Sequence, residues 1–206
     1  MNIYNKVDRL VCYSIDVKLD KVKQGNKVYS HMGGTITDAI LQAGLNYNFV
    51  VYPRVRKLVR DFPDYTTTCD FLVLMQIKPL EELIQWKDKE KLRRIKALTY
   101  LLYSHEVENE FQLLNWLNFP QNIDLLMSMR GIGPKTIDYL KLLSGGQSIA
   151  VDRHLFSFLD LAGVYIKTYE EANLIYKMAA EQLGYALKDF DKMVWNYMSN
   201  IRETKG

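Results

Sequence analysis

Apolar residues recur at intervals of three and four positions along most of this chain, from about residue 33 to residue 199. That spacing gathers apolar side chains on one face of a helix and therefore predicts amphipathic helices. The predicted helices span 34–44, 53–61, 68–76, 79–86, 89–104, 110–117, 122–129, 134–143, 153–162, 169–183 and 189–199. Residues 1–30 alternate poorly and are interrupted by Gly25-Asn26, so they are left unassigned. The pattern predicts an all-α protein.

Prolines and threonines mark several of the predicted helix ends. Pro53 stands where a first-turn proline is tolerated, and Pro63 pushes the residue before it out of the helical region. Thr66-Thr-Thr68 then offers N-caps for the next helix. No Gly- and Ser-rich linker, internal repeat or low-complexity stretch divides the sequence. We therefore expect one unit spanning residues 1–206, either as a single compact assembly or as two lobes facing across a cleft.

The composition narrows the class of protein. The 206 residues are 48% apolar and 25% charged, which is typical of a globular chain. Cys12 and Cys69 are too few for a disulfide framework, a four-thiolate zinc site or a four-cysteine iron–sulfur cluster. The longest apolar run, 71–75, is too short to span a bilayer, and the charged N-terminal residues do not fit a signal peptide. We expect a cytoplasmic protein, and its net charge of +3 permits an anionic partner without requiring one.

The most informative segment is the predicted helical hairpin at residues 122–143. One helix ends at Met129, Gly131-Ile132-Gly133 forms a tight turn, and Pro134 opens the second helix. The glycines let backbone N–H groups approach an external group, and those N–H groups lie at a helix N-terminus that favours an anion such as a DNA phosphate. Ile132 is expected to anchor the turn in the core. The alternative is an ordinary glycine-containing connection between two antiparallel helices.

An aspartate follows this hairpin at the start of the next predicted helix. Asp152 comes seventeen residues after Lys135, within Ser148-Ile-Ala-Val-Asp-Arg-His-Leu-Phe156. Aspartate is among the best N-cap residues, so Asp152 taken alone needs no further function.

Together these residues resemble the helix-hairpin-helix DNA glycosylase superfamily, HhH-GPD, which includes endonuclease III and the 8-oxoguanine glycosylases. Residues 129–135 match its hairpin pattern, and Val151-Asp-Arg-His154 matches the context of its catalytic aspartate. A weaker similarity covers residues 40–48, which resemble the loop that these enzymes insert into DNA. The resemblance implies a two-lobed all-α fold with a cleft between the lobes. Ala150-Val151 replaces the namesake Gly-Pro, as in several lyase members.

The resemblance also implies the chemistry. Lys135 would attack C1′ as a Schiff-base nucleophile, as in members that combine glycosylase and AP lyase activity, and Asp152 would stabilise the positive charge that develops on the sugar. Burial and a helix N-terminus would favour the neutral amine of Lys135, whereas an ionised Asp152 would oppose it. The iron–sulfur cluster of many relatives is excluded by the cysteine count, so no cofactor or metal is expected.

Further residues are candidates for contact with double-stranded DNA from which one nucleotide has been flipped out. At the hairpin we expect contacts from Arg130, Gly131, Ile132, Gly133 and Thr136. Asn46, Tyr47 and Asn48 suit a wedge that fills the gap, although a plain loop after a helix is the alternative. His154 would orient Asp152 or bind phosphate, although a structural hydrogen bond is the more common role of such a histidine. Phe156, Trp195 and Tyr197 are candidates for stacking on the flipped base, although aromatic residues at helical spacing more often belong to the core.

The expected function is that of a monomeric base-excision-repair enzyme. It would excise a damaged base, with an oxidised purine such as 8-oxoguanine as the first candidate, and then nick the strand by β-elimination. Oxidised pyrimidines and mismatched uracil or thymine remain open as substrates. Two other functions also remain open: a monofunctional glycosylase in which Lys135 only binds phosphate, and a non-catalytic DNA-binding module.

Overall fold

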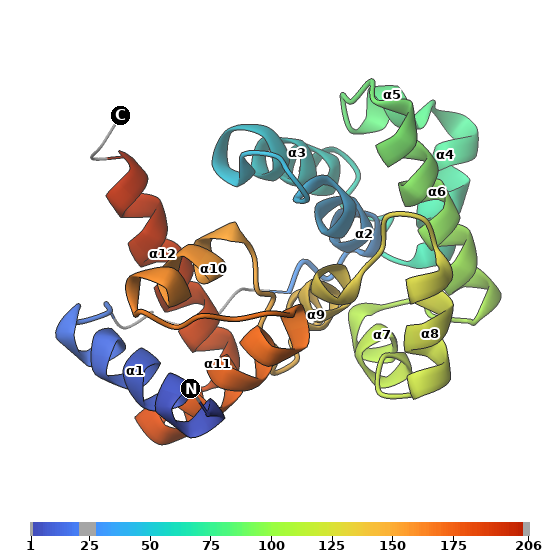
Figure 1. Cartoon of the computed structure of the whole chain (residues 1–206). Helices are drawn as coiled ribbons and strands as arrows, with labels where there is room; N and C mark the ends of the chain where they lie inside the picture. Colours follow the sequence, from blue (N-terminus) through green and yellow to red (C-terminus); the bar gives the residue numbers. More distant parts are fainter. Residues whose placement is uncertain (1, 21–27, 204–206) are drawn as a thin grey trace. The chain divides into compact units, whose positions relative to one another are not determined.

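The computed structural model describes residues 2–20 and 28–203, and every regular element in these ranges is helical (Figure 1). The chain divides into two compact units. We call Met1–Asn26 with Gln147–Gly206 the terminal unit, and Lys27–Gly146 the central unit. Each has its own hydrophobic core. The expectation of an all-α protein is confirmed for the described residues.

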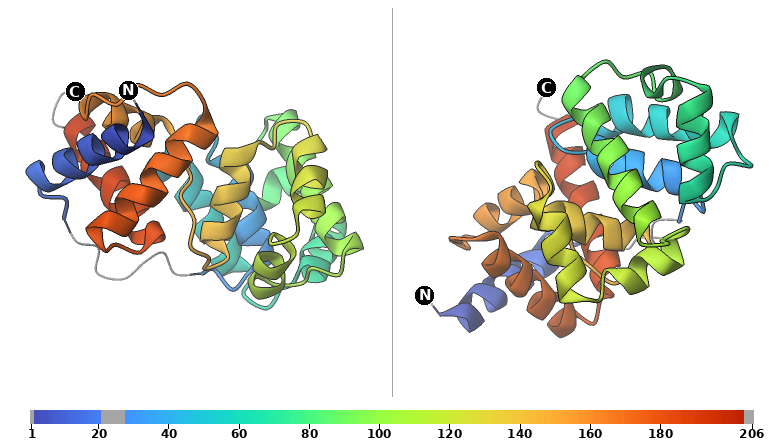
Figure 2. Two further views of the ribbon diagram at one scale, coloured as in Figure 1. Left: turned by 60° about the horizontal axis from the view of Figure 1, so that its bottom comes forward. Right: turned by 90° about the vertical axis from the view of Figure 1, so that its right-hand side faces the viewer.

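The central unit is built around one short helix. Helix α2, Met32–Leu41, is buried along its whole length and contacts α3, α4, α6 and α9. The other elements of the unit are the π-helix η1 and seven further α-helices: η1 Tyr47–Val51, α3 Tyr52–Asp61, α4 Thr68–Ile77, α5 Leu80–Leu83, α6 Lys89–Ser104, α7 Glu110–Trp116, α8 Pro120–Ser128 and α9 Pro134–Leu143. Figure 2 shows α9 and α6 lying against α2 from different sides. A helix buried in this way fixes the positions of its neighbours.

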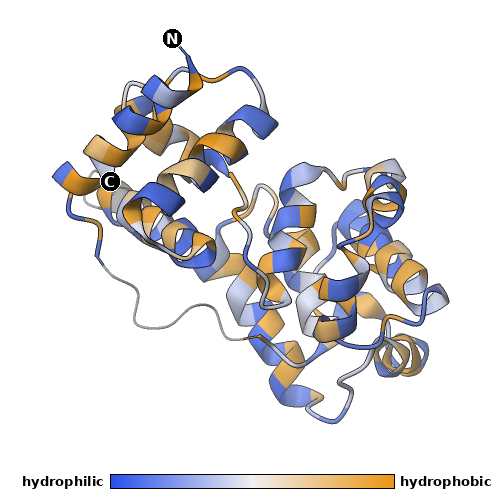
Figure 3. Ribbon diagram, turned by 90° about the horizontal axis from the view of Figure 1, so that it is seen from below, coloured by the Kyte–Doolittle hydropathy of each residue, from blue (hydrophilic) through white to orange (hydrophobic). Residues whose placement is uncertain are grey.

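The terminal unit contains four helices: α1 Ile3–Asp16, α10 Arg153–Leu161, α11 Tyr169–Leu183 and α12 Leu187–Glu203. Helix α1 packs on α11, and α10 packs on α12. The core of this unit includes Phe158, Tyr176 and Phe190, all fully buried. Figure 3 shows hydrophobic and hydrophilic positions alternating around most helices, as amphipathic helices require.

Helix α1 lies within residues 1–30, for which the sequence pattern predicted no element. Its buried positions are Lys6, Val7, Leu10 and Ser14, so two of the four residues that form its inner face are polar. Lys6 forms an ion pair with Glu171 of α11, and the Ser14 hydroxyl donates to the Leu10 carbonyl at 2.7 Å. These polar residues disguise the helical spacing in the sequence. Gly25-Asn26 lies outside the described residues.

The predicted bounds of three helices, 89–104, 134–143 and 169–183, are confirmed. The largest difference concerns α12, predicted at 189–199 and observed at Leu187–Glu203, and the bounds of α2 and α5 also differ. Helix α2 starts earlier than predicted because His31 caps it, with its Nδ1 accepting the Gly34 N–H at 3.1 Å. Helix α5 is much shorter than the predicted 79–86, and Gln85 just after it has a left-handed φ of +51°. A left-handed residue cannot continue an α-helix.

Candidate functional site

The hairpin has the predicted form. Helix α8 ends at Ser128, Met129 is its C-cap, and α9 begins at Pro134. Gly131 adopts a left-handed φ of +83°, which favours glycine, whereas Gly133 is extended at φ −132° and ψ −178°. Ile132 between them is 5% exposed and belongs to the central core, as predicted. The turn therefore needs glycine for its conformation only at residue 131.

The two glycines also differ in their surroundings. A Cβ at Gly131 would lie 2.2 Å from Cζ of Arg94, so a guanidinium covers this part of the turn. A Cβ at Gly133 would meet nothing within 4 Å. Helix α9 has no side-chain cap, and the N–H groups of Thr136 and Ile137 donate to the Gly133 carbonyl at 2.9 and 3.2 Å. The open side of the turn is thus at Gly133.

Charged residues surround the hairpin turn. Glu90 of α6 pairs with Arg93 at 3.0 Å, Arg94 at 3.2 Å and Arg130 at 3.5 Å. The Arg130 side chain is 78% exposed, so its guanidinium remains accessible from solvent despite this pair. Thr136, in contrast, is buried within the hairpin. Of these two predicted DNA-contact residues, only Arg130 presents its side chain outward.

The amine of Lys135 is held by an amide. Lys135 is half-buried in the first turn of α9, and its Nζ donates to Oε1 of Gln42 at 2.7 Å. Gln42 is the C-cap of α2, and its Nε2 is buried without a hydrogen-bond partner among the described residues. A buried donor without an acceptor costs free energy and calls for a specific explanation, such as a bound group.

A second lysine occupies the same end of α2. Lys91 Nζ donates to the carbonyls of Ile40 at 3.0 Å, Leu41 at 3.3 Å and Ala43 at 2.8 Å. A cation at these carbonyls satisfies the C-terminus of a helix and complements its dipole. Burial is the main cause that lowers the pKa of Lys91, followed by the positive charge of Arg94, with a smaller contribution from Lys135. The amines of Lys91 and Lys135 are therefore within electrostatic range of each other.

A fully buried carboxylate lies one helical turn before Gln42. Asp38 Oδ2 accepts hydrogen bonds from the hydroxyls of Tyr29 at 2.7 Å and Tyr47 at 3.3 Å, and Oδ1 accepts one from Tyr139 at 3.1 Å. Burial raises the pKa of Asp38 to about 6, although the three hydroxyl donors favour its charged form and oppose that shift. We call these four residues the Asp38 cluster. The sequence analysis missed it, although Asp38 is a lone charge within an otherwise uncharged helix.

Asp152 belongs to the terminal unit, whereas Lys135 belongs to the central unit. Asp152 is the N-cap of α10, and its Oδ1 accepts the N–H groups of His154 at 2.8 Å and Leu155 at 3.2 Å. Its Oδ2 lies 3.2 Å from Nδ1 of His154, whose ring packs against Trp195. His154 is buried, so of its two expected roles this arrangement favours the orientation of Asp152.

The predicted wedge residues 46–48 have different orientations. Asn46 caps η1 through its Oδ1, which accepts the Phe49 N–H at 3.1 Å, and Asn48 is exposed. Tyr47 instead is partly buried and donates its hydroxyl to Asp38, so it has a structural contact within the central unit. The sequence analysis missed Phe49, which is 77% exposed at the same loop. The sequence signal that could have indicated Phe49 is an aromatic residue directly after the polar residues of the loop.

The three aromatic candidates for base stacking belong to the core of the terminal unit. Phe156, Trp195 and Tyr197 are partly buried against it, and Tyr197 makes an edge contact with Phe158 at 5.8 Å between ring centroids. Their positions therefore agree with a role in the core rather than in base stacking.

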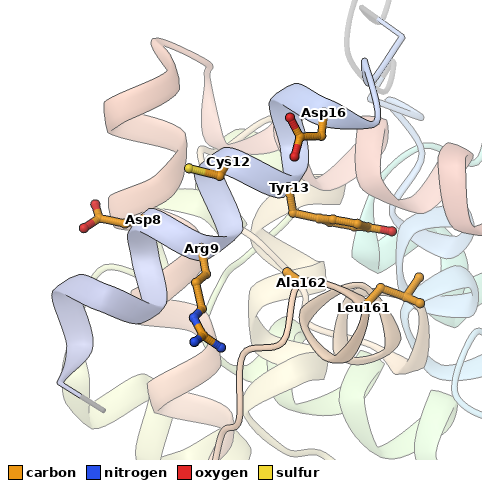
Figure 4. Close-up of a pocket in the computed structure, with 7 residues that line it drawn as sticks. All are labelled: Asp8, Arg9, Cys12, Tyr13, Asp16, Leu161 and Ala162. Atoms are coloured by element: carbon orange, nitrogen blue, oxygen red, sulfur yellow. The ribbon is translucent and has the colours of Figure 1, made fainter.

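A surface depression of about 370 Å³ lies on the terminal unit, and none of the predicted residues lines it. Side chains of α1, among them Arg9, Cys12 and Tyr13, line it together with Leu161 and Ala162 at the end of α10 (Figure 4). Among residues 2–20 and 28–203, no His, Cys, Asp or Glu residues cluster in a way that would hold a metal ion. No helix in the described part of the chain is long and apolar enough to cross a membrane.

Comparison with known proteins gives no relative. Neither a scan of protein-family models, nor a search of curated proteins, nor a search of solved structures found a match to this chain.

The pKa of Asp38 leads to a stability prediction. A carboxyl whose pKa is raised on folding stabilises the fold fully below its unfolded pKa, and this contribution is lost as the pH rises through the folded pKa. For a rise from 3.8 to about 6, the expected loss is about 3 kcal/mol between pH 4 and pH 7. Asp38→Asn should remove this component from the free energy of unfolding, measured in urea across that range. If the free energy of unfolding depended on pH in the same way in both proteins, the raised pKa of Asp38 would be contradicted.

Proposed function

We propose that this protein is a DNA glycosylase/AP lyase of the HhH-GPD type, acting on a damaged base in double-stranded DNA. The observation that carries the proposal is the position of Lys135. It lies in the first turn of α9, two residues after the open Gly133, and its amine donates a hydrogen bond to the side-chain amide of Gln42. An oxidised purine is the first candidate substrate. The two-lobed HhH-GPD fold is part of the proposal and agrees with an all-helical chain of two compact units.

The open end of α9 suits a DNA phosphate. The helix lacks a side-chain cap, and Gly133 presents no Cβ to an approaching group. A phosphate bound here would interact with N–H groups and with the positive end of the helix dipole. Such a contact holds the backbone without reading the sequence, which is what a lesion-searching enzyme needs. Arg130 adds an exposed guanidinium at the same turn.

The proposed chemistry requires Lys135 to act as a neutral amine. Its Nζ donates a hydrogen bond to Oε1 of Gln42, an amide oxygen that carries no formal charge. A neutral amine keeps the lone pair that attack on carbon requires.

The proposed reaction then follows. The Lys135 amine attacks C1′ of the flipped nucleotide, and the base departs with the electron pair of the N-glycosidic bond and takes up a proton. The C1′–O4′ bond then breaks, O4′ takes up a proton lost from the amine nitrogen, and a protonated Schiff base forms. Loss of a proton from C2′ eliminates the 3′ phosphate, and water releases the enzyme from the cleaved strand. Asp152, held by two backbone N–H groups, would stabilise the positive charge on the sugar.

The loop at η1 is proposed to fill the gap that the flipped nucleotide leaves. Phe49 is an exposed aromatic that can stack between bases, and Asn48 can form hydrogen bonds with the unpaired base. Tyr47 anchors the loop from below through Asp38. The wedge thus comprises Asn48 and Phe49 in place of the 46–48 set expected from sequence.

Adding a methyl group at Gly133 tests the phosphate contact. Gly133→Ala introduces neither a left-handed strain nor a close contact, so its thermal unfolding should match that of the unmodified protein. Its affinity for a DNA duplex should fall roughly tenfold through loss of one phosphate contact. Fluorescence anisotropy at several salt concentrations measures this.

The matched control is Gly184→Ala. Gly184 has a φ of +69° with no atom near a Cβ and lies at the end of α11, so its replacement should lower stability without changing DNA affinity. Undiminished DNA affinity of Gly133→Ala would contradict the proposed phosphate contact.

Removing the amine tests the chemistry. Lys135→Ala should abolish cleavage of a duplex carrying a damaged base, while its affinity for that duplex stays within about threefold because the backbone contacts at the turn remain. Gel analysis of cleaved strands and anisotropy give the two readings. Lys141→Ala, in the last turn of the same helix, is the control and should cleave normally. Normal cleavage with a large loss of affinity for Lys135→Ala would overturn the nucleophile role.

A further inference from the structure

Two hydrogen bonds join α2 and α9 one helical turn apart. Asp38 accepts from Tyr139 at 3.1 Å, and Gln42 accepts from Lys135 at 2.7 Å. The two acceptors are four residues apart along α2 and its C-cap, and the two donors are four residues apart on α9. Residues at this spacing lie on the same face of a helix, so the two bonds form successive steps of one interface. We call them the α2–α9 ladder.

The Asp38 step is energetically unusual. Asp38 is fully buried, and no cation in the described part of the chain pairs with it; its partners are three tyrosine hydroxyls. A buried charge satisfied only by neutral donors is costly, and an apolar residue would serve packing better. Buried polar networks that are fully satisfied specify one arrangement of a core. The carboxylate therefore selects a geometry at the expense of stability.

We infer that Asp38 and Tyr139 are positioning residues for Lys135: their hydrogen bond fixes the register of α9 on α2 and so holds the Lys135 amine against Gln42. Tyr139 is partly buried against the central core, and it shares its carboxylate with Tyr47 of the η1 loop. One buried group thus anchors both the helix that carries the amine and the loop proposed as the wedge. The inference rests on the proposed function, because the position of the amine matters only if Lys135 reacts.

Tyr139→Phe removes the Asp38 step and leaves the ring in place. We expect the single-turnover rate of borohydride trapping on a duplex with an abasic site to fall roughly ten- to a hundredfold, because small displacements of a reacting group have effects of this size. The dissociation constant for the same duplex should not change. Tyr29→Phe is the matched control, since it removes a hydrogen bond to Asp38 that does not involve α9, and its trapping rate should stay within threefold. A Tyr139→Phe rate within twofold of the unmodified protein, or an equal fall in Tyr29→Phe, would overturn the inference.

A second experiment tests the α2–α9 ladder without DNA. The acylation rate of the Lys135 amine, followed by mass spectrometry with acetic anhydride, should rise severalfold in Tyr139→Phe and stay unchanged in Tyr29→Phe. An unchanged acylation rate in Tyr139→Phe would overturn the ladder. If the unmodified protein forms no borohydride adduct, the proposed function fails, whereas acylation still decides whether Asp38 and Tyr139 hold the amine.

Discussion

The central unit depends on the burial of a helix that carries polar residues among its apolar ones. Helix α2 is enclosed along its whole length, and its polar groups must find partners inside the core. Asp38 is satisfied by three tyrosines, and the Thr35 hydroxyl donates to Glu110 at 2.8 Å. Each partner comes from a different part of the chain. Burial of α2 therefore sets the arrangement of its neighbours through directed hydrogen bonds as well as apolar contact.

Both ends of α2 are held by groups whose charge state matters. At the N-terminus, His31 accepts the Gly34 N–H through Nδ1, so its Nε2 carries the hydrogen that points to the Phe62 carbonyl, 3.1 Å away. Burial lowers the pKa of His31, which preserves this neutral form. At the C-terminus, Lys91 caps the last carbonyls while Gln42 holds Lys135. One helix thus connects the core to the amine on which the proposed chemistry depends.

Patterns that are local in sequence predicted the structure well. The amphipathic spacing located most helices, and the Gly131-Ile132-Gly133 turn with Pro134 predicted the hairpin and the burial of Ile132. Asp152 is an N-cap, as its residue type indicates. Lys135 was a candidate from its motif alone.

Features that depend on contacts between distant segments were not predictable from local patterns. The partner of Lys135 is Gln42, ninety-three residues away, and the Asp38 cluster joins residues from three elements and a preceding segment. The opposite orientations of Tyr47 and Phe49 depend on a π-helix that no spacing rule indicates. Helix α1 was missed because a buried lysine acquires its partner only when α11 packs against it. Side-chain partners across the core, unlike helix periodicity, arise only from the complete fold.

The central claim is that Lys135 acts as a nucleophile on DNA. It is tested most directly by borohydride trapping on duplexes that carry 8-oxoguanine, uracil, thymine glycol or a plain abasic site, followed by peptide mapping of the adduct. The account predicts a covalent adduct at Lys135 with the abasic duplex and with at least one lesion, and the lesion trapped fastest identifies the substrate class. An adduct at another residue, or none despite measurable binding, would contradict it.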